Sequence, residues 1–258
     1  MHGIGLSAAR YDTFYPYSPL NVGGGTLDLW LKYNTGILDQ SGNESPDLVD
    51  NIRITTWQDS SGNSNNAYQE TQADMPRWVE ASNSVNFANS VKFMDLTSDI
   101  TVTTRRAFTV VAHISFQAMN NDSLCGSGTD DFIRFIDTNS IRILIGDSTQ
   151  NDFNDSNFSF EIDKWYIIIV TRASGSSGMM NIYVKNDHIL NGGGAQSEVD
   201  FGLPHSNADI DEFVINNIGC EGDDTNDLKA KMNSFLIWNG YQLTSSERQD
   251  VYDYLMGI

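Results

Sequence analysis

The chain has 258 residues, 40% of them hydrophobic and 11% aromatic, and it carries 34 acidic against 15 basic residues, for a formal net charge of -19. This composition excludes a disordered chain, which would lack the apolar residues needed for a core. The scattered negative charge disfavours nucleic acid and anionic membranes as partners. The sequence shows neither a secretory leader pattern nor an apolar run long enough to span a bilayer, so we expect cytoplasmic synthesis without membrane insertion.

The first 26 residues form a segment unlike the rest of the chain. Tyr11, Phe14, Tyr15 and Tyr17 lie among prolines without helical or strand periodicity, and three glycines at 23 to 25 follow them. This pattern predicts an extended N-terminal arm over residues 1–26. Because exposed aromatic side chains are unfavourable in water, we expect these four to pack either on the domain or on a neighbouring subunit.

Residues 27–258 are predicted to form one all-β domain. Short apolar stretches rich in β-branched and aromatic residues alternate there with Asn, Asp, Ser and Gly clusters, which is typical of a sandwich or barrel. The predicted strands are 27–33, 91–94, 108–116, 132–136, 141–145, 165–172, 180–185, 213–218 and 234–238. Strand 165–172 is apolar almost throughout, which indicates a central strand covered on both sides. Residues 120–131 and 147–157 are predicted to be polar loops.

One helix is predicted, at the C-terminal end. Thr244 and Glu247 form a capping-box pattern, in which each side chain satisfies a backbone N–H group of the other residue. Val251, Tyr254 and Leu255 then fall on one helical face. We expect a short amphipathic helix that lies on the sandwich.

Three stretches in order along the chain carry a family resemblance. They are Leu-Trp-Leu-Lys at 29–32 with the Trp-Gln-Asp-Ser-Ser-Gly-Asn turn in 56–67, the hairpin-like pair 164–172 and 181–187, and the closing segment 234–244. Together they resemble the concanavalin A-like domains of laminin G type, which occur in extracellular proteins and in bacteriophage virion proteins. The resemblance implies a jelly-roll sandwich of two antiparallel sheets with a short C-terminal helix.

Candidates for glycoside hydrolysis are sparse. This chemistry uses two closely spaced carboxylates, and the nearest patterns are Glu161 with Asp163, and Asp209, Asp211 and Glu212. Neither continues with the further acid that glucanases of this fold require. The four histidines, His2, His113, His188 and His205, are expected mainly at the surface or in turns, so an enzyme is the least favoured interpretation.

A calcium site is the one cofactor that the sequence leaves open. Asp and Asn oxygens in loops suit this hard cation. The candidate ligands are Asp130, Asp131, Asp152 and Asp155, with Asp147, Asp223, Asp224 and Asp227 as further candidates. Their spacing does not match the regular calcium loop, and solvated acidic loops are the alternative. Cys125 and Cys220 lack zinc or disulfide spacing and are expected to be small buried residues.

Sugar binding would need an exposed aromatic ring beside polar side chains in a shallow groove. Trp57, Trp78, Tyr68 or Trp238 are the candidates for this ring. The family resemblance places Trp57, Trp165 and Trp238 in packing roles and Trp78 at a turn that leads into a strand.

The resemblance and the aromatic arm together favour a non-enzymatic accessory protein of a virion, in the capsid, tail or fibre. Such a protein would be made in the host cytoplasm, would contact other virion proteins, would form homo-oligomers through the arm, and could meet a host glycan. The alternative is a bacterial or secreted carbohydrate-binding or adhesion module that acts outside the cell or at its surface.

Overall fold

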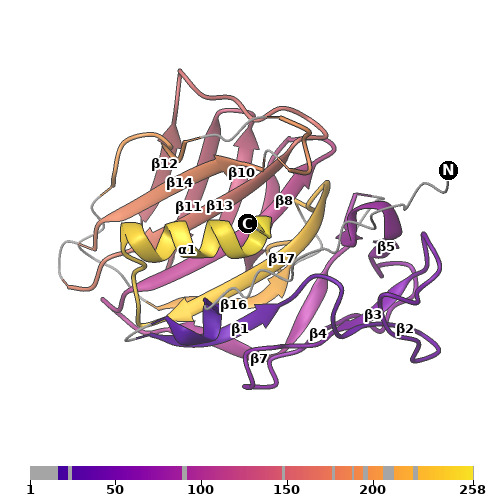
Figure 1. Ribbon diagram of the computed structural model, residues 1–258. Coiled ribbons are helices and arrows are strands. Elements are labelled where there is room, and N and C mark those ends of the chain that lie inside the picture. The colour runs from indigo at the N-terminus through magenta and orange to yellow at the C-terminus, as the bar shows by residue number, and fades with distance from the viewer. Residues whose placement is uncertain are drawn as a thin grey trace, which may run out of the picture.

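The computed structural model describes residues 17–22, 25–88, 92–146, 149–175, 178–187, 189–193, 197–205, 212–222 and 226–257. Nearly all of its regular structure is β (Figure 1). In chain order the elements are η1 (Pro19–Asn21), β1 (Thr26–Leu31), β2 (Ile37–Asp39), β3 (Ile54–Trp57), β4 (Ala67–Tyr68), β5 (Arg77–Val79), η2 (Glu80–Ser82), β6 (Ser84–Asn86), β7 (Met94–Val102), β8 (Phe108–Phe116), β9 (Asp122–Gly126), β10 (Phe132–Asp137), β11 (Ser140–Ile145), β12 (Thr149–Asn154), β13 (Trp165–Arg172), β14 (Met180–Asn186), β15 (Val199–Asp200), β16 (Phe213–Ile218), β17 (Ala230–Asn239) and α1 (Ser245–Met256).

Two antiparallel sheets form a sandwich, as the sequence predicts. Sheet A has the strand order β15-β14-β13-β8-β17-β6-β5, with β1 also paired to β17. Sheet B has the order β12-β11-β10-β9-β16-β7-β4-β3-β2. The inner faces of both sheets supply one continuous apolar core, because alternate residues of each strand point inward. The fold-class prediction is therefore confirmed.

The centre of sheet A is buried on both of its faces. All eight residues of β13 are buried: Tyr166, Ile168 and Val170 face the central core, whereas Ile167 and Ile169 belong to a second apolar cluster on the outer face. This arrangement confirms the prediction of a central strand that is covered on both sides.

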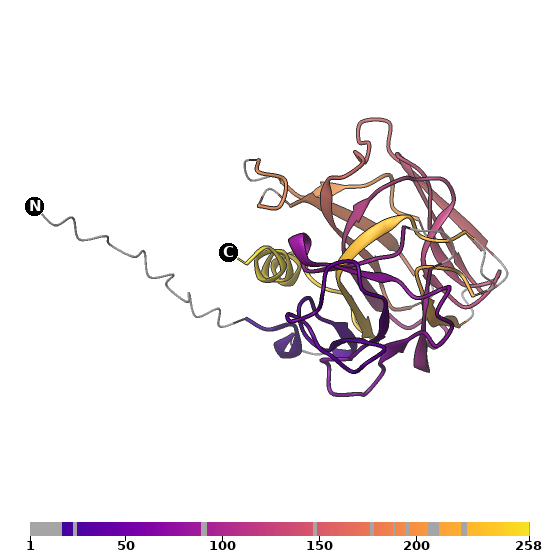
Figure 2. The same cartoon turned by 90° about the vertical axis from the view of Figure 1, so that its right-hand side faces the viewer.

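Helix α1 covers the outer face of sheet A (Figures 1 and 2). The predicted capping box is present at its start, between Thr244 and Glu247. Val251 and Leu255 are buried against the sheet, whereas Tyr254 is partly buried beside them. Among the described residues, no helix is both long enough and apolar enough to cross a membrane.

Only part of the predicted N-terminal arm lies among the described residues. Tyr11, Phe14 and Tyr15 lie outside them. Tyr17 packs on the cluster beneath α1, and Val22 is buried in that cluster. Burial raises the pKa of the Tyr17 hydroxyl, and the nearby carboxylates of Asp250 and Glu247 raise it further. For Tyr17, the contact is therefore within the chain.

The two predicted polar loops are wrong in part, because each contains a strand. Residues 120–131 include β9, and residues 147–157 include β12. In β9, Asp122 and Ser123 are fully buried, and Asp122 is paired with Lys229 at 3.0 Å. Polar residues with such partners can occupy a strand, but single-sequence patterns resemble a loop there. Strands β2–β6 were missed because each has only two to four residues, too few to show a periodic pattern. Strands 108–116, 165–172 and 213–218 have the predicted bounds.

Candidate functional site

A shallow groove on sheet B is centred on Tyr68. Tyr68 in β4 pairs with Thr56 in β3, next to the pair Ala67 and Trp57, both of which are buried in the core. Because side chains alternate along a strand, Tyr68 and Thr56 face outward. The groove has a volume of about 420 Å³, within the usual range of roughly 300–1,000 Å³ for ligand sites. Its lining consists of Gln40, Thr55, Thr56, Tyr68, Gln69, Glu70 and Met75.

The floor of this groove is held in place by hydrogen bonds. The Thr55 hydroxyl lies 3.0 Å from the carbonyl oxygen of Asp39 and can donate to it. The Gln69 side chain accepts from the Thr71 N–H group at 2.9 Å and donates to the Phe93 carbonyl at 3.4 Å. Gln40 and Glu70 are exposed at the rim. The groove therefore combines a fixed polar floor with the partly exposed aromatic ring of Tyr68.

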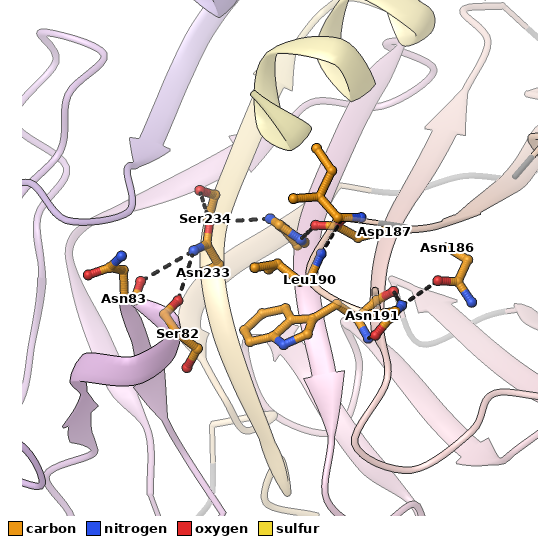
Figure 3. Close-up of polar contacts among 11 residues, drawn as sticks. Ser82, Asn83, Asn186, Asp187, Leu190, Asn191, Asn233 and Ser234 are labelled. Carbon is orange, nitrogen blue, oxygen red and sulfur yellow. Dashed lines mark hydrogen bonds and ion pairs between the residues drawn. The ribbon is translucent and has the colours of Figure 1, made fainter. Parts of the chain in front are cut away.

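A second feature lies on the opposite outer face, in sheet A. His113 is buried in β8, where the register places it opposite Ser234. A β-bulge at Asn233 interrupts β17 between Met232 and Ser234. A bulge turns a side chain out of the regular alternation, and here it brings the Asn233 amide to 3.2 Å from Nδ1 of His113. Figure 3 shows Asn233 and Ser234 in this arrangement.

The contacts around His113 fix the orientation of its neighbours. Asn233 Nδ2 donates to the carbonyl oxygens of Ser82 and Asn83, at 3.4 and 3.3 Å, so its Oδ1 must face the imidazole (Figure 3). On the other side, His113 Nε2 lies 2.9 Å from Oδ2 of Asp187. Both ring nitrogens thus face acceptor oxygen atoms, one from Asn233 and one from Asp187.

Asp187 is buried together with its histidine partner. Its Oδ1 accepts from the backbone N–H groups of Ile189 and Leu190, at 2.8 and 3.1 Å. Burial raises the pKa of this carboxyl, but the hydrogen bond and positive charge of His113 and the two N–H groups outweigh burial, so the pKa of Asp187 lies below its ordinary value. The ring of Trp165 packs edge-on against His113 with centroids 5.2 Å apart. The result is a buried ion pair in a fixed geometry.

The calcium candidates lie on separate elements of sheet B and its loops. Asp130 is exposed, whereas Asp131 is buried and accepts from the Gly146 N–H group at 2.9 Å. Asp152 is paired with Arg142 at 2.7 Å, and Asp155 accepts from the Asn157 N–H group. Among the described residues, no group of three or more His, Cys, Asp and Glu side chains is arranged to hold a metal ion. Asp147, Asp223 and Asp224 lie outside the described residues, whereas Asp227 lies in the segment before β17.

The carboxylates considered for glycoside hydrolysis are not on a strand in the described part of the chain. Glu161 and Asp163 are exposed in the turn before β13, and Asp163 has a positive φ of 59°. Asp209 and Asp211 lie outside the described residues, and Glu212 is exposed. The strand-borne pair considered from the sequence is therefore not formed by Glu161 and Asp163.

The four aromatic candidates for a sugar platform differ in their exposure to solvent. Trp57, Trp78 and Trp238 are fully buried, so none can act as a sugar platform, whereas Tyr68 keeps an exposed part. The packing roles expected for Trp57, Trp165 and Trp238 are confirmed, and the free cysteines Cys125 and Cys220 are buried as expected.

The expectation that the histidines lie mainly at the surface is wrong for His113, and His205 is partly buried, with its ring 4.6 Å from that of Phe153. His2 and His188 lie outside the described residues. The sequence does indicate that His113 is buried, because it lies in the middle of the apolar predicted strand 108–116. The sequence did not reveal its partners, Asp187 and Asn233, which are distant along the chain.

Comparison with known proteins shows similarity of fold. No family model and no curated protein matches the sequence. Among solved structures, an arabinofuranosidase complexed with arabinofuranosyl-α-1,2-xylobiose aligns with a TM-score of 0.61 and 14% identity over 90% of this chain and 59% of its own. Domain 4 of an extracellular GH43 arabinanase from Geobacillus stearothermophilus, solved in complex with arabinotriose, aligns with a TM-score of 0.55 and 13% identity over 88% of this chain and 98% of its own. This chain thus spans 59% of the arabinofuranosidase chain but nearly all of the arabinanase domain.

The comparison corrects the expected function. The prediction of a non-enzymatic virion component is wrong, because these similar structures are a glycoside hydrolase and a domain of another, and neither is a virion protein. The similarity favours the alternative that the sequence left open, a carbohydrate-binding module. At this level of identity the comparison shows the fold alone: the chain is a β-sandwich of the kind found in carbohydrate-active proteins, compatible with the concanavalin A-like jelly roll.

Proposed function

We propose that this domain binds a short, neutral oligosaccharide in the Tyr68 groove. The proposal depends on the groove itself, which places the partly exposed ring of Tyr68 beside the Thr56 hydroxyl and the Gln40 amide. Thr55 and Gln69 form the floor below them and are already hydrogen-bonded within the protein. A sugar ring has an apolar face of C–H groups and an edge of hydroxyls. The first packs on an aromatic ring, and the second exchanges hydrogen bonds with hydroxyls and amides, which can both donate and accept.

Charge narrows the class of ligand. The chain carries a net charge of -19. Among the described residues that line the Tyr68 groove, Glu70 is the charged one, and its charge is also negative. This field opposes sulfated or uronic-acid glycans, because like charges repel. A neutral glycan meets no such barrier. Arabinose-containing oligosaccharides are the first ligands to test, since the arabinanase domain that aligns with this chain was solved with arabinotriose.

The test is calorimetric titration of the full chain with arabinotriose, xylotriose and cellotriose. We expect saturable binding of at least one of them, and we expect Tyr68→Ala to weaken that binding at least tenfold, which is about 1.4 kcal/mol. Tyr68→Phe keeps the ring and should lose less. Val49→Ala, at a residue that is 74% exposed and does not line the groove, is the control and should bind normally.

Two outcomes would contradict the proposal: one concerns carbohydrate binding itself, and the other concerns its location in the Tyr68 groove. If none of a broad panel of neutral glycans binds, carbohydrate recognition itself is refuted. If a glycan binds equally well to the wild type and to Tyr68→Ala, the groove is the wrong site. Release of reducing ends in the same samples measures whether bound sugar is also cleaved, a reaction for which two carboxylates usually lie about 5–10 Å apart.

A further inference from the structure

A second cavity lies on the outer face of sheet A, away from the Tyr68 groove. Its volume is about 200 Å³, many times the roughly 10–15 Å³ needed by one water molecule. The segment after β1, helix η2, the turn after β14 and the end of α1 all contribute to its wall. The lining includes Tyr33, Asn83, Leu190 and Met256, and the polar floor consists of His113, Asp187 and Asn233. Figure 3 shows the floor residues Asp187 and Asn233 with Leu190.

The floor is built before any ligand arrives. His113, Asp187 and Asn233 are 1%, 1% and 6% exposed, and each is held by hydrogen bonds or ionic contacts from different elements. The Asp187 carboxylate faces Nε2 of His113 and accepts two backbone N–H groups, so its charge is already compensated by polar partners within the protein. A site whose polar groups are already positioned binds with a small ordering cost. This arrangement suits a neutral ligand that carries hydroxyl groups.

One carboxylate oxygen at the floor of the cavity can still accept a hydrogen bond. Oδ1 of Asp187 already accepts two N–H groups, whereas Oδ2 faces Nε2 of His113. A carboxylate oxygen has two lone pairs, so Oδ2 can accept one more donor. The C-terminal end of α1 lies at the edge of the cavity, and the Gly257 N–H group there caps the carbonyl groups of Asp253 and Tyr254. The remaining acceptor capacity of Oδ2 calls for a donor from the ligand, as a sugar hydroxyl is.

The mouth of the cavity is apolar. Ile189 and Leu190 are 46% and 45% exposed, high values for such large aliphatic residues, and the partly exposed ring of Tyr33 lines the same cavity. These side chains can cover the C–H face of a sugar ring while the floor binds its hydroxyls. The volume is below the roughly 300–1,000 Å³ of larger ligand sites, so the cavity fits one ring rather than a chain.

We infer that this cavity is a second carbohydrate-binding site, which takes a single neutral sugar ring, free or at the end of a glycan. The inference does not rest on the Tyr68 groove, because the two sites share no residue and lie on opposite outer faces of the sandwich. If both sites bind sugar, the domain is bivalent and can link two chains or two points of one glycan surface.

The imidazole of His113 provides a local probe. In ¹⁵N-labelled protein, its ring signals can be assigned by replacing the other three histidines with glutamine. L-arabinose, D-xylose and D-galactose are then titrated, with glycerol as the control polyol. We expect a saturable shift of the His113 signals with at least one sugar at millimolar concentration, and no saturation with glycerol. Tyr68→Ala should leave this binding unchanged.

Two variants at the mouth separate binding from a general effect on the fold. Leu190→Trp places a larger side chain over the mouth and should abolish the shift, whereas Leu190→Ala should retain it. Tyr33→Ala should weaken binding roughly fivefold or more, since it removes the aromatic wall. Thermal unfolding of each variant checks that the fold is kept.

The inference is overturned if none of the sugars produces a saturable His113 shift in the wild type, or if Leu190→Trp binds as well as the wild type does. Loss of the His113 shift in Tyr68→Ala would assign the binding to the groove alone. Failure of the groove proposal is seen separately, in the arabinotriose titration, so the two hypotheses can fail independently.

Discussion

Replacement of Asp187 by Asn should destabilise the protein strongly and in a pH-dependent way. Asp187 and His113 are each 1% exposed and lie 2.9 Å apart. Removal of one partner from a buried ion pair leaves the other charge unpaired, at a cost of about 3–5 kcal/mol. With a slope near 3 kcal/mol per molar urea, this cost lowers the unfolding midpoint by roughly 1–2 M.

The loss should be full near neutral pH and smaller in strong acid. The wild-type carboxyl of Asp187 has a lowered pKa, so it stays charged at neutral pH and takes up a proton only in strong acid, where the wild type loses the same contribution. We therefore expect the full loss of stability near pH 7 and a smaller one below about pH 3. Urea denaturation at a series of pH values measures both, with Asp47→Asn as the control, because Asp47 is exposed.

The stability of the wild-type protein should also fall in acid. The pKa of Asp187 is lower in the folded protein than in the unfolded chain, so its contribution is present above an unfolded pKa of about 3.9 and is lost as pH falls through the folded value. Asp187→Asn should flatten this part of the profile. An equal loss of stability at both pH values, with the acid slope unchanged, would refute this account of the pair.

Three further variants test other parts of the fold by the same denaturation assay. Phe160→Ala should cost about 3–5 kcal/mol, because its buried ring lies 5.0–5.9 Å from five other aromatic rings; a loss below 1 kcal/mol would contradict the packing. Thr244→Ala should cost about 1 kcal/mol by removing the capping box of α1, and an unchanged midpoint would refute the role of the cap. Asp152→Asn should cost less than about 1 kcal/mol, because its pair with Arg142 is partly exposed to solvent; a calcium-dependent loss would instead support the metal-site prediction.

Local sequence patterns predicted those strands and the helix whose own residues, by composition or capping, indicate the structure. The strands 108–116 and 165–172 are long, β-branched and apolar, so burial on both faces could be predicted from their composition. The capping box likewise depends on residues only three positions apart. The missed strands β9 and β12 are rich in polar residues. In β9, the buried Asp122 and Ser123 contact Lys229 and Glu221, which are 107 and 98 residues away in the sequence.

The sequence by itself determined the all-β class and the C-terminal helix, because periodicity and capping residues decide these features locally. The two-sheet sandwich and the packing role of the tryptophans followed from the family resemblance. Tertiary structure decided which aromatic residue stays exposed, and it selected Tyr68 from four candidates. It also joined His113 to Asp187 and Asn233, which are 74 and 120 residues away in the sequence. Strand pairing and one β-bulge create that contact, and no local pattern encodes the register that aligns β8 with β17.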